Sequence, residues 1–185
     1  MNHADHVALI RAGVSSGDAA ADVVRTWADI GAGAGAFTLA LADLLGPGAR
    51  IVAVDRDAAA LRENARRLAG HGPAVTLETV VADLTGPLDL PALDGLVAAN
   101  ALHFVHPDRL AAVVAALAGH LRPGSPFVVV EYETSRPTPW LPYPLPFDDL
   151  RRVTSAAGLT DARRTGSDPS TSGGGMYAAT ARAPG

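Results

Sequence analysis

The sequence predicts a single α/β domain built around a mostly parallel sheet of seven strands, with helices on both faces. Short apolar, β-branched runs alternate with helical patterns along the chain, which is typical of βα units around a parallel sheet. The 185 residues are 48% hydrophobic, which is enough for one compact core. The runs expected to form strands are 25–30, 50–54, 75–81, 95–100, 126–132, 160–164 and 176–181.

Two helices are well marked between these strands. The first has an apolar face formed by Leu61, Ala65 and Leu68. The second follows Pro107, which suits a first-turn position, and is expected to end just before Gly124. Its apolar residues at helical spacing are Leu110, Val113, Val114, Leu117 and Leu121. The segment 166–175 is rich in Ser, Gly, Asp and Pro and is expected to connect the last two strands as a long flexible loop.

Composition excludes several classes of function. The net charge of -4 lacks the basic surplus that binding to a nucleic-acid backbone needs. The absence of cysteine and lysine removes thiolate metal sites, thiol nucleophiles and Schiff-base mechanisms. The uncharged stretch 30–42 is too short to cross a bilayer, and 1–13 has no signal-peptide apolar core. We therefore expect a cytoplasmic protein that binds neither nucleic acid nor membrane.

A glycine-rich turn directly follows the first expected strand. Gly31, Gly33 and Gly35 alternate there, and without Cβ atoms they let a ligand approach main-chain N–H groups closely. Asp55 ends the next strand, where its carboxylate can accept hydrogen bonds from both ribose hydroxyls. The pattern predicts a nucleotide-like ligand.

The glycines alone are compatible with a second class of ligand. Gly31-x-Gly33-x-x-Ala36, with an acid about 20 residues further on, also fits the dinucleotide fingerprint of nicotinamide enzymes. Two further acids separate the interpretations: Asp29, two residues before the first glycine, and Asp83, at the end of the third strand.

Together these motifs resemble those of the class I S-adenosylmethionine (SAM)-dependent methyltransferases, over roughly 27–132. The motifs that carry the resemblance are Asp29-x-Gly31-x-Gly33-x-Gly35, Asp55, Ala82-Asp83-Leu84, Ala99-Asn100-Ala101-Leu102-His103-Phe104 and Leu121-Arg122-Pro123-Gly124. The resemblance implies a Rossmann-like sheet of order 3-2-1-4-5-7-6 with an antiparallel last strand. It also divides the single domain, 1–185, into an N-terminal cap (1–24), a cofactor-binding core (25–132) and a substrate-side loop with a C-terminal hairpin (133–185).

The resemblance further implies which residues hold the cofactor. The glycines would line the methionine moiety, Asp29 would orient their loop or meet the amino group, and Asn100 would lie beneath the sulfonium. Asp55 would hold the ribose, and Asp83 would meet the adenine amino group. The whole set is Asp29, Gly31, Ala32, Gly33, Gly35, Asp55, Arg56, Ala82, Asp83, Leu84 and Asn100. Structural alternatives are a turn acid for Asp29, a helix N-cap for Asp83 and a strand-end cap for Asn100.

Methyl transfer from a sulfonium is an in-line displacement, so a dedicated base is optional. For a hydroxyl acceptor the candidate bases are His103, Glu131 and His106, with packing or backbone hydrogen bonding as the alternative for His103. His103-x-x-His106 has no third ligand at a recognisable spacing, so no metal is expected.

The acceptor side is expected in the proline-rich segment 134–147. Trp140 and Tyr143 are predicted to form a wall over the methyl donor, while Phe147 is expected to begin a helix and pack on the core. By family resemblance, His6 and Arg11 of the N-terminal segment are placed near the pocket mouth. The little sequence outside the core favours a small-molecule methyl acceptor.

The expected function is thus a SAM-dependent methyltransferase with S-adenosylhomocysteine (SAH) as product, acting as a monomer or homodimer on an N-, O- or C-acceptor. Two alternatives stay open: a SAM-binding protein with other chemistry or none, and an NAD-dependent oxidoreductase.

Overall fold

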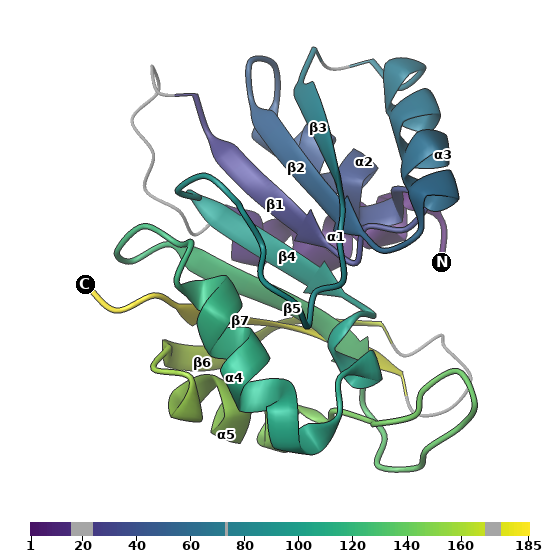
Figure 1. The fold of residues 1–185 in the computed structure, drawn as a ribbon. Coiled ribbons are helices and arrows are strands. Elements are labelled where there is room, and N and C mark those ends of the chain that lie inside the picture. The colour runs from purple at the N-terminus through teal and green to yellow at the C-terminus, as the bar shows by residue number, and fades with distance from the viewer. Residues whose placement is uncertain (16–23, 73, 169–174) are drawn as a thin grey trace.

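The computed structural model describes residues 1–15, 24–72, 74–168 and 175–185, and these form a seven-stranded sheet in the order β3-β2-β1-β4-β5-β7-β6 (Figure 1). Adjacent strands from β3 to β5 pair in parallel, and β7 is antiparallel to both β5 and β6. The strands are β1 (Thr26–Ile30), β2 (Arg50–Asp55), β3 (Thr76–Val81), β4 (Gly95–Ala99), β5 (Pro126–Tyr132), β6 (Thr160–Asp168) and β7 (Met176–Arg182). The predicted strand order and the antiparallel last strand are confirmed.

Helices cover both faces of this sheet (Figure 1). The helices are α1 (His3–Val14), α2 (Ala36–Leu45), α3 (Ala58–Ala69), α4 (Pro107–Ala118) and α5 (Phe147–Ala156), with a 3-10 turn, η1, at Leu102–Phe104. Apolar side chains of α1 and α2 pack with one face of the central strands, and α3 joins this layer. Those of α4 and α5 pack with the opposite face. Two apolar cores therefore hold the central strands rigid, as a site at their ends requires.

Helix α4 ends earlier than the sequence analysis predicted. It stops at Ala118, with Gly119 as its C-cap, because the chain then turns toward the segment that contains Leu93. Leu121 forms an isolated parallel bridge with Leu93, and the N–H of Leu93 donates to the carbonyl of His120 at 2.8 Å. Leu121 is therefore buried beside Leu93 and is not part of the helix. Its apolar spacing in the sequence did not reveal this difference.

Strand β6 is longer than predicted. It continues past Arg164 to Asp168, where Ser167 pairs with Tyr177 and Asp168 pairs with Met176. The hairpin partner β7 supplies main-chain hydrogen bonds that the polar composition of 166–168 did not suggest, and register shifts accommodate the pairing. The rest of the predicted loop, 169–174, lies outside the described residues.

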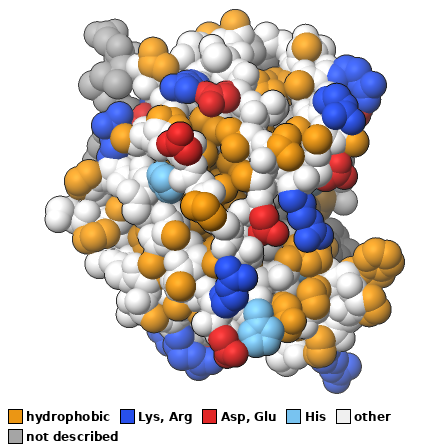
Figure 2. Space-filling view, viewed as in Figure 1, with side chains coloured by type: hydrophobic (Ala, Val, Ile, Leu, Met, Phe, Trp, Pro, Cys, Tyr) orange, Lys and Arg blue, Asp and Glu red, His pale blue; other side chains and the backbone are white. Residues whose placement is uncertain are grey.

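The predicted start of α5 at Phe147 is confirmed, and its ring packs edge-on against Tyr177 with centroids 5.8 Å apart. Within the described residues, we find no helix with the length and apolar character needed to span a bilayer. On the face shown in Figure 2, arginines are scattered among acidic and hydrophobic side chains.

Candidate functional site

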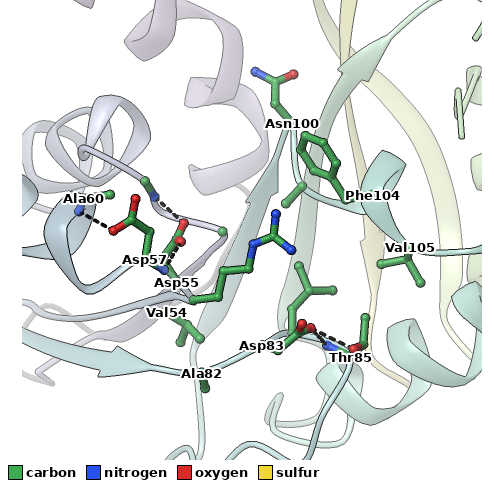
Figure 3. A pocket seen from close by; sticks show the side chains of 15 residues that line it. Val54, Asp55, Asp57, Ala60, Ala82, Asp83, Thr85, Asn100, Phe104 and Val105 are labelled. Carbon is green, nitrogen blue, oxygen red and sulfur yellow. Dashed lines mark hydrogen bonds between the residues drawn. The ribbon is translucent and has the colours of Figure 1, made fainter. Parts of the chain in front are cut away.

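A cleft of about 370 Å³ opens at the carboxyl ends of β1, β2, β3 and β4 (Figure 3). The strand order reverses between β1 and β4, and ligands of open α/β sheets bind at such a switch point. Figure 3 shows Asp55 and Asp57 on one side of the cleft, Asn100 and Phe104 on another, and Asp83 next to Thr85 below. The lining residues are Gly31, Gly33, Val54, Asp55, Arg56, Asp57, Ala60, Ala82, Asp83, Leu84, Thr85, Asn100, Ala101, Phe104 and Val105.

The glycine loop after β1 has positive φ at all three glycines, with φ of 72° at Gly31, 51° at Gly33 and 88° at Gly35. Each glycine meets a different surrounding. A Cβ on Gly31 would lie 2.6 Å from that of Ala101, and one on Gly35 would lie 2.4 Å from Oδ1 of Asn64. A Cβ on Gly33 would meet nothing within 4 Å, because this glycine faces the cleft. The loop thus has a left-handed backbone at all three glycines, packs closely at Gly31 and Gly35, and is open to the cleft at Gly33.

Asp55 ties this loop to the end of β2. Its Oδ2 accepts a hydrogen bond from the N–H of Gly33 at 2.8 Å, and its Oδ1 accepts one from the N–H of Asp57 at 2.8 Å. Each carboxylate oxygen can accept a further hydrogen bond, so the carboxylate is fixed in place yet able to bind a pair of hydroxyls. Asp57 in turn caps the N-terminus of α3.

Asp29 lies behind the loop, only 1% exposed, and is absent from the cleft lining. Thr38 donates its hydroxyl to Oδ2 of Asp29 at 2.6 Å, and Asn64 donates its amide to that hydroxyl at 2.7 Å. Burial, with a smaller contribution from the nearby charge of Asp55, raises the pKa of Asp29 to about 6, against the lowering effect of the hydrogen bonds from Thr38. The geometry favours an orienting role for Asp29, since it joins β1 to the first turn of α2.

Replacing Asp29 by Asn is expected to flatten the dependence of stability on pH. Because the pKa of Asp29 is raised from 3.8 to about 6 on folding, the folded protein holds the proton more tightly than the unfolded chain. The stability from this proton is complete below about pH 4 and is lost as the pH rises through 6. An Asn oxygen still accepts from Thr38 without titrating. The free energy of unfolding of Asp29→Asn relative to wild type should therefore rise by roughly 2–2.5 kcal/mol between pH 4 and pH 7.

Urea unfolding at several pH values measures this difference. Identical pH dependence of the variant and the wild type would contradict the buried-carboxylate interpretation.

Asp83 forms a turn at the end of β3 rather than capping a helix. Its Oδ1 accepts from the N–H of Thr85 at 2.8 Å and from the Thr85 hydroxyl at 2.7 Å, and the N–H of Gly86 donates to the Asp83 carbonyl. These two hydrogen bonds lower the pKa of Asp83, and the charges of Arg56 and Arg109 add to the effect. In the described segment 74–168 the next helical element after Asp83 is η1, so the N-cap alternative is wrong.

Asn100 follows β4 in a left-handed conformation, with φ of 52°. Its N–H donates to the carbonyl of Val130 at 2.9 Å, which holds the residue at the mouth of the cleft. Its Oδ1 is buried and has no hydrogen-bond partner among the described residues. A buried acceptor without a partner is costly, so a donor on a bound molecule would satisfy it.

His103 and Glu131 form a buried pair beside the cleft. The His103 ring is 3% exposed and the Glu131 side chain 0%, and Nδ1 of His103 lies 2.6 Å from Oε2 of Glu131. The other carboxylate oxygen accepts from the N–H groups of Leu102 at 3.0 Å and His103 at 3.2 Å. Glu131 therefore anchors η1 to β5 and fixes the orientation of the imidazole.

A family model described as a methyltransferase domain matches residues 28–124, just over half of the chain. The chain belongs to this methyltransferase family. The matched residues of the methyltransferase contain the glycine loop, Asp55, Asp83, Asn100 and His103. No curated protein matches its sequence.

The fold of the methyltransferase is similar to several solved structures. The N-methyltransferase NodS from Bradyrhizobium japonicum WM9 has 19% identity and a TM-score of 0.76, over 98% of this chain and 96% of that one. Magnesium protoporphyrin IX methyltransferase ChlM from Synechocystis PCC 6803, solved with bound SAM, has 17% identity and a TM-score of 0.71, over 97% and 78%. The SAM-dependent methyltransferase SibL has 21% identity and a TM-score of 0.68, over 88% and 51%. The chain thus spans about half the length of SibL. The predictions of a class I SAM-dependent methyltransferase and its Rossmann-like fold are confirmed.

Neither of the two predicted aromatic residues of the methyltransferase, Trp140 and Tyr143, is among the described residues that line the cleft, but Tyr143 contacts η1 beside it. The N–H of Tyr143 donates to the carbonyl of His103 at 3.1 Å, and its ring lies edge-on to His106 with centroids 5.1 Å apart. His106 is exposed and caps α4 through the N–H of Asp108. Trp140, by contrast, is 84% exposed. The structure therefore brings Tyr143, His103 and His106 together and leaves Trp140 in solvent.

The structure does not bring the two predicted N-terminal residues to the cleft. His6 packs edge-on against Phe37 of α2, with ring centroids 4.9 Å apart, and Arg11 is exposed on α1. Neither is among the described residues that line the cleft, because α1 packs against α2 and the β5, β6 and β7 part of the sheet.

Several lining residues were not predicted. Phe104 is the most prominent, since it is a 52% exposed aromatic side chain at the cleft. Its signal was available, because it ends the motif that contains Asn100 and His103. Thr85 and Asp57 were missed for another reason: both act through hydrogen bonds to neighbouring acids that only the folded loops reveal.

Proposed function

We propose that this methyltransferase transfers the methyl group of SAM to a small-molecule acceptor, releasing SAH. The observation that carries the proposal is the cleft itself: Gly33, Asp55, Asp83 and Asn100 lie at the carboxyl ends of four different strands and line one cavity at the sheet switch point. SAM supplies an electrophilic methyl on a sulfonium. The protein binds the two reactants, aligns them and excludes water from between them.

The cleft geometry supports a specific set of cofactor contacts. We assign the ribose hydroxyls to the fixed carboxylate of Asp55 and the adenine amino group to Asp83, which the Thr85 hydrogen bonds hold ionised. The open main chain at Gly33 suits the methionine moiety. The unpartnered Oδ1 of Asn100 suits the positively charged sulfonium of the methionine moiety. Arg56, Ala82 and Leu84 complete the lining around these groups.

Beyond the methyl donor, we place the acceptor beside Phe104 of η1, the turn whose His103 carbonyl accepts a hydrogen bond from the N–H of Tyr143. For a hydroxyl acceptor, the base is His103. Glu131 accepts the Nδ1–H, which leaves Nε2 to take the acceptor proton as the methyl group forms its new bond to oxygen. Glu131 acts as a positioning residue and His106 as a second candidate at the rim. Trp140, exposed on the same segment, would contact only an acceptor that extends out of the cleft.

Calorimetry with SAM, SAH and NAD tests the cofactor assignment, and micromolar or tighter binding of SAM and SAH without NAD is expected. Tight NAD binding without SAM binding would overturn it.

Incubation with methyl-labelled SAM and a metabolite extract then tests the chemistry. A labelled small product together with SAH supports methyl transfer, whereas binding without either product supports a SAM-binding protein of other function. Gel filtration decides between a monomer and a homodimer, and the cytoplasmic location stays a prediction.

Replacing Asp55 by Ala is expected to weaken SAM and SAH binding at least about tenfold. The change removes charge-assisted hydrogen bonds to the ribose, each worth roughly 1.5–3 kcal/mol, and also releases the N–H of Gly33. Calorimetry gives both affinities. The matched control is Asp148→Ala, an exposed acid in the first turn of α5 far along the chain from the cleft. Unchanged affinity in a folded Asp55→Ala variant would refute the ribose assignment.

A further inference from the structure

Three metal-ligating side chains converge at a place separate from the cofactor cleft. His3 lies in the first turn of α1, Asp43 lies near the end of α2, and His71 lies in the turn after α3. The Nε2 atom of His3 is 2.7 Å from Oδ2 of Asp43, and Nε2 of His71 is 2.9 Å from Oδ1. One donor atom from each residue can be chosen so that all three lie within 4.8 Å of one another. None of the three lines the cleft.

The convergence does not follow from local helix geometry. His3 and His71 are separated from Asp43 by 40 and 28 positions in the sequence. Three separate segments of the chain therefore bring two ring nitrogens and one carboxylate close together. The two imidazoles also contact each other edge-on, with centroids 4.8 Å apart. His6, one turn after His3, faces Phe37 instead and does not belong to this group.

The donor set matches a particular class of cation. Two imidazoles and one carboxylate are ligands that Zn²⁺ accepts, and three protein ligands leave the fourth tetrahedral position for water. Bonds of about 2.0–2.1 Å place tetrahedral donor atoms about 3.3–3.4 Å apart. The distances between the donor atoms of the three residues range from 2.7 Å up to 4.8 Å at most and so bracket this value. Small side-chain rotations would bring the donor atoms to tetrahedral spacing. The side chains are 24–39% exposed, which gives solvent access for the ion and its water.

Asp43 is already in the form that binds a cation. Partial burial opposes its charge, but the hydrogen bonds from His3 and His71 outweigh burial and lower the pKa of the carboxyl below its ordinary value. Zn²⁺ needs neutral imidazoles with a free Nε2 lone pair, so binding replaces the protons that now lie between nitrogen and oxygen.

We propose that His3, Asp43 and His71 bind one Zn²⁺ ion with water as the fourth ligand. The ion would join the first turn of α1 to α2 and to the turn after α3, which are otherwise connected here through hydrogen bonds and ring contacts. Because the site is separate from the lining of the cleft, the ion would hold these segments together and take no part in methyl transfer. Sequence spacing could not reveal such a site, since its ligands belong to three distant segments.

Titration of the chelator-treated full chain, carrying no histidine tag, tests the site. Co²⁺ serves as a spectroscopic probe, because a tetrahedral site gives an intense visible absorption, and Zn²⁺ is then added in competition. We expect saturation at one equivalent of Co²⁺ and full displacement by Zn²⁺. Removal of a direct ligand in His71→Ala or His3→Ala should weaken Zn²⁺ binding at least about 100-fold. The matched control is His120→Ala, a histidine outside the cluster, which should bind as wild type does.

Stability and cofactor binding provide independent measurements. Zn²⁺ should raise the Tm of wild type and of His120→Ala by several degrees and leave that of His71→Ala unchanged. SAH affinity shows that each variant is folded and should be equal in all of them. The proposal is overturned if wild type binds no Zn²⁺ near one equivalent, or if His71→Ala binds as tightly as His120→Ala. Unchanged affinity in His3→Ala would overturn the link to α1. These outcomes do not depend on the methyl-transfer proposal.

Discussion

Replacing Glu131 by Ala is expected to lower the free energy of unfolding by about 3–5 kcal/mol, the usual cost of breaking a buried pair by removing one partner. The carboxylate accepts three hydrogen bonds in a fully buried position, two from main-chain N–H groups and one from His103. All three donors would lose their partner together. For a chain of this size the Tm should fall by roughly 6–20 °C, which calorimetry or thermal unfolding measures.

Two further variants separate this effect from the general cost of changing an acidic residue in this part of the chain. Glu131→Gln keeps one side-chain oxygen that can accept hydrogen bonds from either the main-chain N–H groups of η1 or the His103 ring. It should therefore lose less stability than Glu131→Ala. Glu133, just beyond β5, pairs with Arg164 at a partly exposed position and accepts a long hydrogen bond of 3.4 Å from the N–H of Phe147, so Glu133→Ala should cost only about 1 kcal/mol. Equal losses in Glu131→Ala and Glu133→Ala would show that the buried pair does not anchor η1.

The sequence predicted the fold well because each strand carries its own local signal. Apolar, β-branched runs mark the strands apart from the polar β6, and the differences in the strands and in α4 lie at element ends, where α4 stops at Ala118 and β6 continues to Asp168. Those ends depend on partners distant in sequence: the bridge between Leu93 and Leu121, and the pairing of β6 with β7. Local propensity carries no information about such partners.

The cofactor side of the site was predictable for a related reason. The glycine loop lies within one strand-turn-helix unit, and Asp55, Asp83 and Asn100 each follow a parallel strand, so all of them reach the same sheet edge. The exposure of Trp140 and the distance of His6 from the cleft depend on how surface segments pack. No spacing rule predicts that packing. The same limit applies to His3, Asp43 and His71, which tertiary structure alone brings together.

Replacing His103 by Ala is expected to lower the turnover of an O-methylation by about 10²-fold or more, with little change in SAM affinity. The Nδ1 contact with Glu131 orients the ring and favours the tautomer whose Nε2 can accept a proton, as in other carboxylate–histidine pairs. Steady-state kinetics with the acceptor found by labelling gives kcat and KM separately.

The neighbouring histidine provides the control for this prediction. His106→Ala removes an exposed imidazole that touches Tyr143 and caps α4, so it should change stability slightly and turnover far less than His103→Ala. Intact turnover in His103→Ala, together with a lower Tm, would assign His103 to packing. The 3% exposure of its ring makes this a sharp test, because a base so enclosed serves only an acceptor that fits directly against it, beneath the segment held by Tyr143. For an acceptor nitrogen that is already neutral, the same variant should keep most of its turnover, since the in-line displacement then needs positioning more than a base.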